Sequence, residues 1–140
     1  MAKRTKVVES KNLPELFIQG TVSSGTGKGK CFMELPWVRS QVEEKIGFTP
    51  YPGTLNLLLN KKNADSKTVL ENSEGVMILP EAGYYSGLLF KAQVKTTFCA
   101  VVLPVVPNYQ KNLLEVIAPN YLRHSLNLVD GSEVAIKIKV

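Results

Sequence analysis

Short apolar stretches alternate with turn residues along most of the chain. The last stretch, residues 134–140 (VAIKIKV), alternates apolar and polar positions with the period of a strand that has one face toward solvent. The other stretches cover residues 16–18, 31–33, 55–59, 76–79, 88–94, 96–103 and 113–117. Many short strands separated by Gly, Asp and Pro turns predict a mainly β fold, either a compact barrel or a sandwich.

Two helices and one loop interrupt this β pattern. The spacing predicts a helix over residues 37–46, because three aliphatic side chains share one helical face: Val38, Val42 and Ile46. Pro36 suits its first turn, and Gly47 suits the left-handed position just past its end. A shorter helix is expected after Pro119. Residues 61–74 are polar apart from three positions, so we expect an exposed loop there.

The composition is that of one folded domain. The chain has 140 residues, of which 44% are hydrophobic and 21% charged, close to globular averages. Its longest nearly apolar run, residues 98–106, contains Pro104 and is too short for a spanning helix, which needs about 18 residues, so no membrane partner is expected. The basic residues 1–6 are not followed by an apolar segment, which predicts a cytoplasmic chain without a secretory signal.

Cysteine, histidine and net charge exclude some classes of site. Cys31 and Cys99 each lie in an apolar stretch, which is typical of reduced core thiols and not of a disulfide framework or a paired metal site. The single histidine, His124, excludes a His-rich zinc site. The net charge of +5 suits anionic ligands in general, including nucleotides, phosphates and nucleic acid.

The densest glycine cluster covers residues 23–30 (SSGTGKGK). Glycine at every second position allows a phosphate to approach the backbone, and it permits the φ angles that aim successive N–H groups at one anion. The spacing is neither that of a Walker A loop nor that of GxGxxG. On spacing alone, a phosphate cradle and a flexible hairpin turn are equally consistent with this cluster.

A polar pair follows the next turn. Thr54 and Asn56 are two residues apart, so on a strand both project to one face while Leu55 and Leu57 point into a core. Their hydroxyl and amide oxygens are acceptable ligands for Mg²⁺ when phosphates and waters complete its shell. The alternative is that both side chains satisfy local backbone groups beside a turn.

A single carboxylate interrupts a later apolar stretch. Glu115 lies between Leu114 and Val116, where it either faces solvent or stands at the mouth of a barrel. At a barrel mouth it could hydrogen-bond a polyol or accept a proton from a hydroxyl. The rigid corner that follows, at Ala118 and Pro119, leads to polar groups that could read a flat base.

The motifs, taken together and in order, resemble the archaeal CTP-dependent riboflavin kinases. The matching phrases are GxVxSGxGxGxxF at residues 20–32, LP at 35–36, GFxPYxGTLNL at 47–57 and ExIAP at 115–119. The resemblance implies a cradle-loop (RIFT-like) β-barrel, six-stranded in type, with one or two short helices. It assigns residues 17–140 to a single barrel domain and leaves residues 1–16 as an N-terminal extension.

The resemblance also implies an activity and the residues that carry it. The reaction is transfer of the γ-phosphoryl of CTP to the ribityl 5′-hydroxyl of riboflavin, giving FMN and CDP. Residues that would contact the nucleotide are Gly25, Thr26, Gly27, Lys28, Gly29, Lys30, Asn120, Tyr121, Leu122 and Arg123. Thr54 and Asn56 would bind Mg²⁺, and Glu115 would contact the flavin's ribityl or phosphate end as the candidate catalytic residue.

One position departs from the family pattern. Where the family has a threonine eight residues before the glutamate, this chain has Pro107, which offers neither a side-chain nor a backbone donor. Either Asn108, as a flavin-binding residue, or Tyr109 substitutes for that threonine, or flavin binding is altered.

Two other functions remain open. The ending at residues 126–134 resembles the hairpin ending of cradle-loop barrels, a group that includes both enzymes and AbrB-like DNA-binding proteins, and the net charge is positive. The basic residues are spread along the chain, however, so nucleic acid is not the expected partner. The other alternative is a flavin or nucleotide carrier without catalysis, which the departure at Pro107 leaves open.

Overall fold

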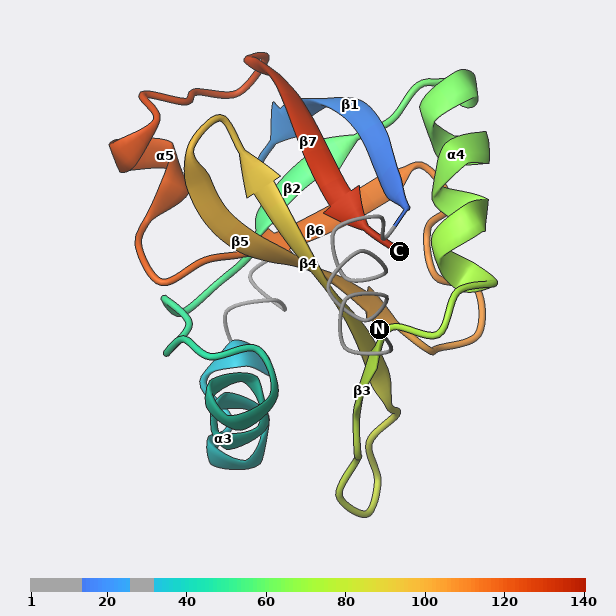
Figure 1. Cartoon of the computed structure of the whole chain (residues 1–140), viewed down its shortest axis with the longest axis vertical. Coiled ribbons are helices and arrows are strands. Elements are labelled where there is room, and N and C mark those ends of the chain that lie inside the picture. The colour runs from blue at the N-terminus through green and yellow to red at the C-terminus, as the bar shows by residue number, and fades with distance from the viewer. Residues whose placement is uncertain (1–13, 26–31) are drawn as a thin grey trace, which may run out of the picture.

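The computed structural model describes residues 14–25 and 32–140. Along the chain the elements are β1 (Glu15–Ser23), α3 (Pro36–Lys45), β2 (Leu55–Leu58), α4 (Lys61–Glu71), β3 (Val76–Ile78), β4 (Gly87–Val94), β5 (Thr97–Pro104), β6 (Leu113–Ile117), α5 (Leu122–Ser125) and β7 (Glu133–Lys139) (Figure 1). The predicted mainly β fold with short helices is confirmed.

Six strands close into an antiparallel barrel. Their order around the barrel is β4, β5, β6, β2, β1 and β7, and the ring closes where Ala92 of β4 pairs with Ile138 of β7. β3 lies outside this ring and pairs with β4. The six-stranded barrel is therefore confirmed. β3 and β4 form the hairpin whose loop lies at the bottom of Figure 1.

Alternating strand positions fill the barrel. In β7, for example, Val134, Ile136 and Ile138 are buried and belong to the central core. β5 differs, because five successive residues, 99–103, are buried. Its outward-facing Ala100 and Val102 belong to a second buried cluster with residues of α3, which lies below the barrel in Figure 1. The long apolar run in the sequence is thus a strand covered on both faces.

The two predicted helices are present. α3 begins at Pro36, buries Val38 and Val42 and ends before Gly47, whose φ is +102°. α5 is a single turn that buries Leu122. Among the described residues, no helix is both long enough and apolar enough to cross a membrane.

The prediction of an exposed loop over residues 61–74 is wrong. Residues Lys61–Glu71 form α4, which Asn60 caps by accepting a hydrogen bond from the Asn63 N–H at 2.9 Å. The helix buries only three side chains: Ala64, Lys67 and Leu70. Because one of these three is a lysine and another an alanine, the helix has no hydrophobic stripe that the sequence pattern could reveal.

The apolar stretch at residues 31–33 does not behave as a strand where it is described. Phe32 and Met33 have helical backbone, and Met33 is fully buried in the second cluster. Cys31 lies outside the described residues. Cys99 is a free thiol buried in β5, where burial raises its pKa to about 12, so the predicted core thiol is confirmed at this position.

Candidate active site

Three polar side chains meet where β2 pairs with β6. Thr54 directly precedes β2 and Asn56 lies within it, and the burial of Leu55 and Leu57 confirms that the polar pair shares the opposite face. Glu115 of β6 is the register partner of Asn56. Thr54 Oγ1 donates a hydrogen bond to Glu115 Oε1 at 2.9 Å. Strand pairing therefore joins two motifs that lie far apart in the sequence.

The Thr54 hydroxyl and the Asn56 carbonyl form a pair of oxygen donors. Thr54 Oγ1 has one hydrogen, and its shorter hydrogen bond is the one to Glu115 Oε1; Asn56 Oδ1 lies 3.5 Å from Oγ1. Two such oxygens suit a hydrated divalent cation. The described residues contain no cluster of three or more His, Cys, Asp or Glu that could hold a metal ion. Any cation here would need further ligands from the substrate.

The glycine-rich segment begins against this pair. Gly25 follows the end of β1, and a Cβ added to it would come within 2.2 Å of Asn56 Nδ2. No other residue type fits there unless the Asn56 amide moves. The other residues predicted to hold phosphate lie outside the described residues: Thr26, Gly27, Lys28, Gly29 and Lys30.

The second oxygen of Glu115 is held by a tyrosine. Tyr109, in the loop between β5 and β6, donates its phenolic hydrogen to Glu115 Oε2. Burial and, after it, the neighbouring Glu115 charge hold the pKa of Tyr109 above its usual range. The phenol is therefore a hydrogen-bond donor at neutral pH, and the carboxylate is fixed from both sides.

Thr54 lines a pocket at the start of α5, called the α5 pocket below, with a cavity volume of about 60 Å³. The rings of Tyr51 and Tyr121 stack at its wall, with centroids 5.0 Å apart and planes inclined by 19°. The Tyr51 N–H donates to the Ala118 carbonyl at 2.8 Å. The pocket is also lined by every residue of the second segment predicted to contact the nucleotide: Asn120, Tyr121, Leu122 and Arg123.

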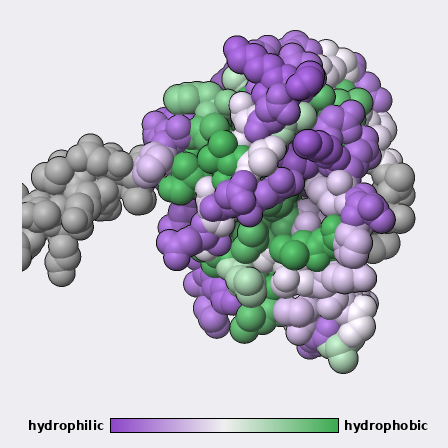
Figure 2. All heavy atoms as spheres, turned by 90° about the vertical axis from the view of Figure 1, so that its right-hand side faces the viewer, coloured by the Kyte–Doolittle hydropathy of each residue, from purple (hydrophilic) through white to green (hydrophobic). Residues whose placement is uncertain are grey.

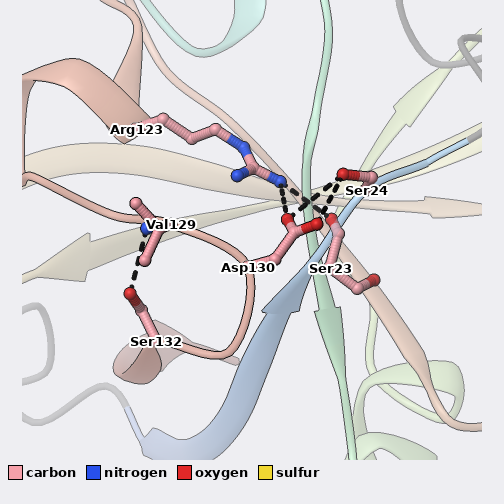
Figure 3. Close-up of polar contacts among 6 residues, drawn as sticks. All are labelled: Ser23, Ser24, Arg123, Val129, Asp130 and Ser132. Carbon is pink, nitrogen blue, oxygen red and sulfur yellow. Dashed lines mark hydrogen bonds and ion pairs between the residues drawn. The ribbon is translucent and has the colours of Figure 1, made fainter.

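Arg123 is part of a polar cluster that connects the α5 pocket to the end of β1 (Figure 3). Its Nη2 lies 2.7 Å from Asp130 Oδ1 and donates to the Ser23 carbonyl at 3.2 Å. Ser24 Oγ donates to the same carboxylate, at 2.8 Å from Oδ2. Hydrogen bonds from Arg123 and then Ser24 hold the pKa of Asp130 below its usual range. The cluster thus fixes the residues directly before Gly25.

Tyr109 lines a larger pocket, called the β5–β6 pocket below, with a cavity volume of about 630 Å³. Its walls are mainly apolar and include Leu88, Leu103 and residues 104–107. Asn108 also lines it, in a left-handed conformation with φ of +60°. Figure 2 looks onto the side of the molecule that carries α4 and shows hydrophobic surface exposed among hydrophilic residues. Pockets of this volume and character bind small organic molecules.

Comparison with known proteins identifies the family. The family model for CTP-dependent riboflavin kinases, described as domain of unknown function DUF120, matches residues 22–138. The chain belongs to this family. Riboflavin kinase from Saccharolobus solfataricus is 35% identical over 92% of this chain and 77% of its own length. Riboflavin kinases from Pyrobaculum islandicum and Archaeoglobus fulgidus are 37% and 35% identical, and the chain spans only 62% and 54% of their lengths.

In this riboflavin kinase family member, the predicted site residues that the structure describes lie in three places. Thr54, Asn56 and Glu115 lie together, with Gly25 against them. The segment 120–123 lines the adjoining α5 pocket, while Asn108 lines the β5–β6 pocket and contacts none of the other predicted residues by hydrogen bond among the described contacts. The individual roles of these residues stay predictions.

The sequence interpretation missed three residues of the site. Tyr51 lies within the matched phrase at residues 47–57, so its aromatic ring beside a turn was an available signal. Asp130 lies in a turn that carries no sign of its partner Arg123. Lys67 lies in α4, where the sequence pattern predicts a loop, and its contact with the Tyr109 ring leaves no trace in the sequence.

Proposed function

We propose that this chain transfers the γ-phosphoryl of CTP to the ribityl 5′-hydroxyl of riboflavin, giving FMN and CDP. Besides family membership, one observation carries the proposal. The Glu115 carboxylate is hydrogen-bonded by Thr54, which lines the α5 pocket, and by Tyr109, which lines the β5–β6 pocket. A reaction between ligands in these two pockets would take place at this carboxylate.

The chemistry of the pockets supports one assignment of the two substrates. The β5–β6 pocket has the volume and the apolar walls that a flavin ring system requires. The α5 pocket offers the stacked rings of Tyr51 and Tyr121 to a nucleobase and lies beside the start of the glycine-rich segment. We therefore assign riboflavin to the β5–β6 pocket and the cytidine end of CTP to the α5 pocket.

The oxygen pair of Thr54 and Asn56 fits Mg²⁺, the metal that the family implies. Both donors are uncharged oxygens, and they lie 3.5 Å apart. When bound with the nucleotide, Mg²⁺ would neutralise charge on the phosphates. Because neither donor is charged, we expect metal binding to depend strongly on CTP.

The protein's own part is to position the acceptor hydroxyl. Each oxygen of Glu115 accepts one hydrogen bond and keeps a free lone pair, so the carboxylate can also accept a hydrogen bond from the ribityl 5′-hydroxyl. In that position it can take the hydroxyl proton as the γ-phosphoryl is transferred. Tyr109 lies two residues after Pro107 and supplies a hydroxyl in the region where the family has a threonine.

Product analysis tests the proposal directly. The chain is incubated with riboflavin, Mg²⁺ and each nucleoside triphosphate in turn, and FMN is measured by chromatography. We expect FMN with CTP and much less with ATP at sub-saturating concentration; equal yields would contradict the nucleotide assignment. Flavin binding without FMN from any donor would indicate a carrier without catalysis.

A gel-shift titration at two salt concentrations tests the DNA-binding alternative. The affinity of such a protein for DNA would fall steeply with salt. The cytoplasmic location stays a prediction.

A further inference from the structure

A buried lysine in α4 contacts the loop that carries Tyr109. The Lys67 side chain is 1% exposed and is the only charged residue buried among the described residues. Its Nζ donates to the main-chain carbonyls of Gln110 at 3.0 Å and Leu113 at 2.8 Å. It also lies 4.9 Å from the centre of the Tyr109 ring. Two carbonyls and one aromatic face thus match the three hydrogens of the ammonium group.

Burial of this charge is costly, and no ion pair offsets the cost. None of the ion pairs among the described residues involves Lys67. Burial lowers the pKa of Lys67, and the more distant charges of Glu71 and Glu115 raise it by less. An apolar side chain of similar length would avoid this desolvation cost. The role of a lysine at this position therefore lies in the groups that its ammonium contacts, which are two main-chain carbonyls and the Tyr109 ring.

Lys67 holds the active-site carboxylate by two routes. The first runs through the Tyr109 ring, whose hydroxyl donates to Glu115. The second runs through the main chain, because Leu113 is the first residue of β6 and Glu115 follows two residues later. The first route ends at Glu115 Oε2, whereas Thr54 donates to the other carboxylate oxygen, Oε1. Tyr109, which carries this route, also lines the β5–β6 pocket.

We propose that Lys67 is a positioning residue for the phosphoryl acceptor. Its ammonium fixes the 110–113 turn and the Tyr109 ring, and through them it orients the Glu115 carboxylate beside the tyrosine that lines the β5–β6 pocket. The proposal rests on the proposed kinase function and adds to it a specific dependence. Loss of the ammonium group lowers kcat/KM for riboflavin and leaves CTP binding unchanged, because Lys67 does not line the α5 pocket.

The test compares Lys67→Met with Lys62→Met, an exposed lysine on the same helix. Both variants are assayed below their melting temperatures, with riboflavin and CTP varied separately. We expect Lys67→Met to lower kcat/KM for riboflavin by about 10- to 100-fold, the scale of misplacing a reacting group, with an unchanged KM for CTP. Lys62→Met should match the wild type. Lys67→Leu, a shorter apolar replacement, takes its place if Lys67→Met does not fold.

A double-mutant cycle with Tyr109→Phe separates positioning from general stability. If Lys67 acts through the tyrosine, Lys67→Met adds much less to the loss in the Tyr109→Phe background than it causes alone. Fully additive effects would overturn the route through Tyr109, and equal changes in KM for both substrates would overturn the proposal as a whole.

Amide hydrogen exchange gives a readout that does not depend on catalysis. Lys67→Met should speed exchange in residues 110–115, and unchanged exchange there would also overturn the proposal. The wild-type assay for FMN decides the kinase function separately, so failure of that function and failure of the positioning role give different results.

Discussion

The backbone of Gly25 lies against the side-chain amide of Asn56, so closely that a Cβ at residue 25 would come within 2.2 Å of Asn56 Nδ2. This contact joins the start of the proposed phosphate loop to one of the two proposed metal donors. It also gives a reason for glycine at this position that does not depend on phosphate binding, since the side chain of any other residue would displace the amide.

We expect Gly25→Ala to disturb the site without unfolding the barrel. The added methyl group pushes the Asn56 amide away from Thr54, so Mg²⁺-dependent CTP affinity should fall while the far-UV spectrum is retained. Calorimetry with CTP and Mg²⁺ measures the change. Gly87→Ala is the matched control, because its Cβ would meet no atom closer than 3.9 Å. Equal CTP affinity in Gly25→Ala and the wild type would show that the contact has no functional role.

Removing either proposed metal donor should reduce catalysis more than stability. Asn56→Ala and Thr54→Val each remove one oxygen and should lower kcat on the order of a hundredfold, the scale of losing one preorganised electrostatic contact. The concentration of Mg²⁺ needed for half-maximal rate should rise in both. Thr54→Ser retains the hydroxyl and serves as the control. If Asn56→Ala makes FMN at the wild-type rate, or if its melting loss explains the inactivity, Asn56 is a structural residue.

The stacked tyrosines should contribute to nucleotide binding alone. Tyr121→Ala removes the ring that lies 5.0 Å from Tyr51 and should raise the KM for CTP by roughly 2- to 10-fold, the range expected for an aromatic contact of about 0.5–1.5 kcal/mol. Tyr121→Phe keeps the ring and should behave like the wild type. A change confined to the KM for riboflavin would contradict the assignment of the α5 pocket to the nucleotide.

The Asp130 cluster should weaken at low pH. Its hydrogen bonds from Arg123 and Ser24 hold the pKa of Asp130 down, so its stabilising effect is complete above the ordinary aspartate range and is lost as the pH falls through the lowered pKa. Melting temperatures of the wild type and Asp130→Asn should therefore differ by a constant amount near neutral pH and converge in strong acid. Because the pair is exposed, the difference should be small. A difference that grows toward acid would contradict the hydrogen-bond pattern.

Cys99 should titrate only in strong alkali. Burial raises its pKa from 9.0 to about 12, so the folded chain binds more protons than the unfolded chain between these values and stability falls as the pH rises through them. Urea unfolding of the wild type and Cys99→Ala at several pH values isolates this contribution. In a Cys31→Ser background, a thiol reagent should modify Cys99 at pH 8 only after unfolding. Rapid modification of the folded protein would contradict the burial.

Features set by neighbouring residues could be read from the sequence alone. The helix over Pro36–Lys45 has its aliphatic face, its proline and its glycine within one short segment, and the common face of Thr54 and Asn56 follows from strand alternation. The resemblance of ordered motifs added the family, the barrel and the candidate residues, because it depends on their order along the chain and not on contacts between them.

Tertiary structure alone decided which of these residues meet. Thr54 reaches Glu115 because β2 pairs with β6 in one register out of several. Ser24 reaches Asp130, and Arg123 reaches the Ser23 carbonyl, because β1 ends beside the turn that precedes β7. Sequence periodicity indicates which positions of one helix or strand are buried and which are exposed. It does not indicate which distant strands or side chains pair with each other. α4 shows the same limit most clearly: its inward lysine is stabilised by two carbonyls and a ring from another part of the chain, so a charged side chain of a mostly exposed helix is buried in the fold.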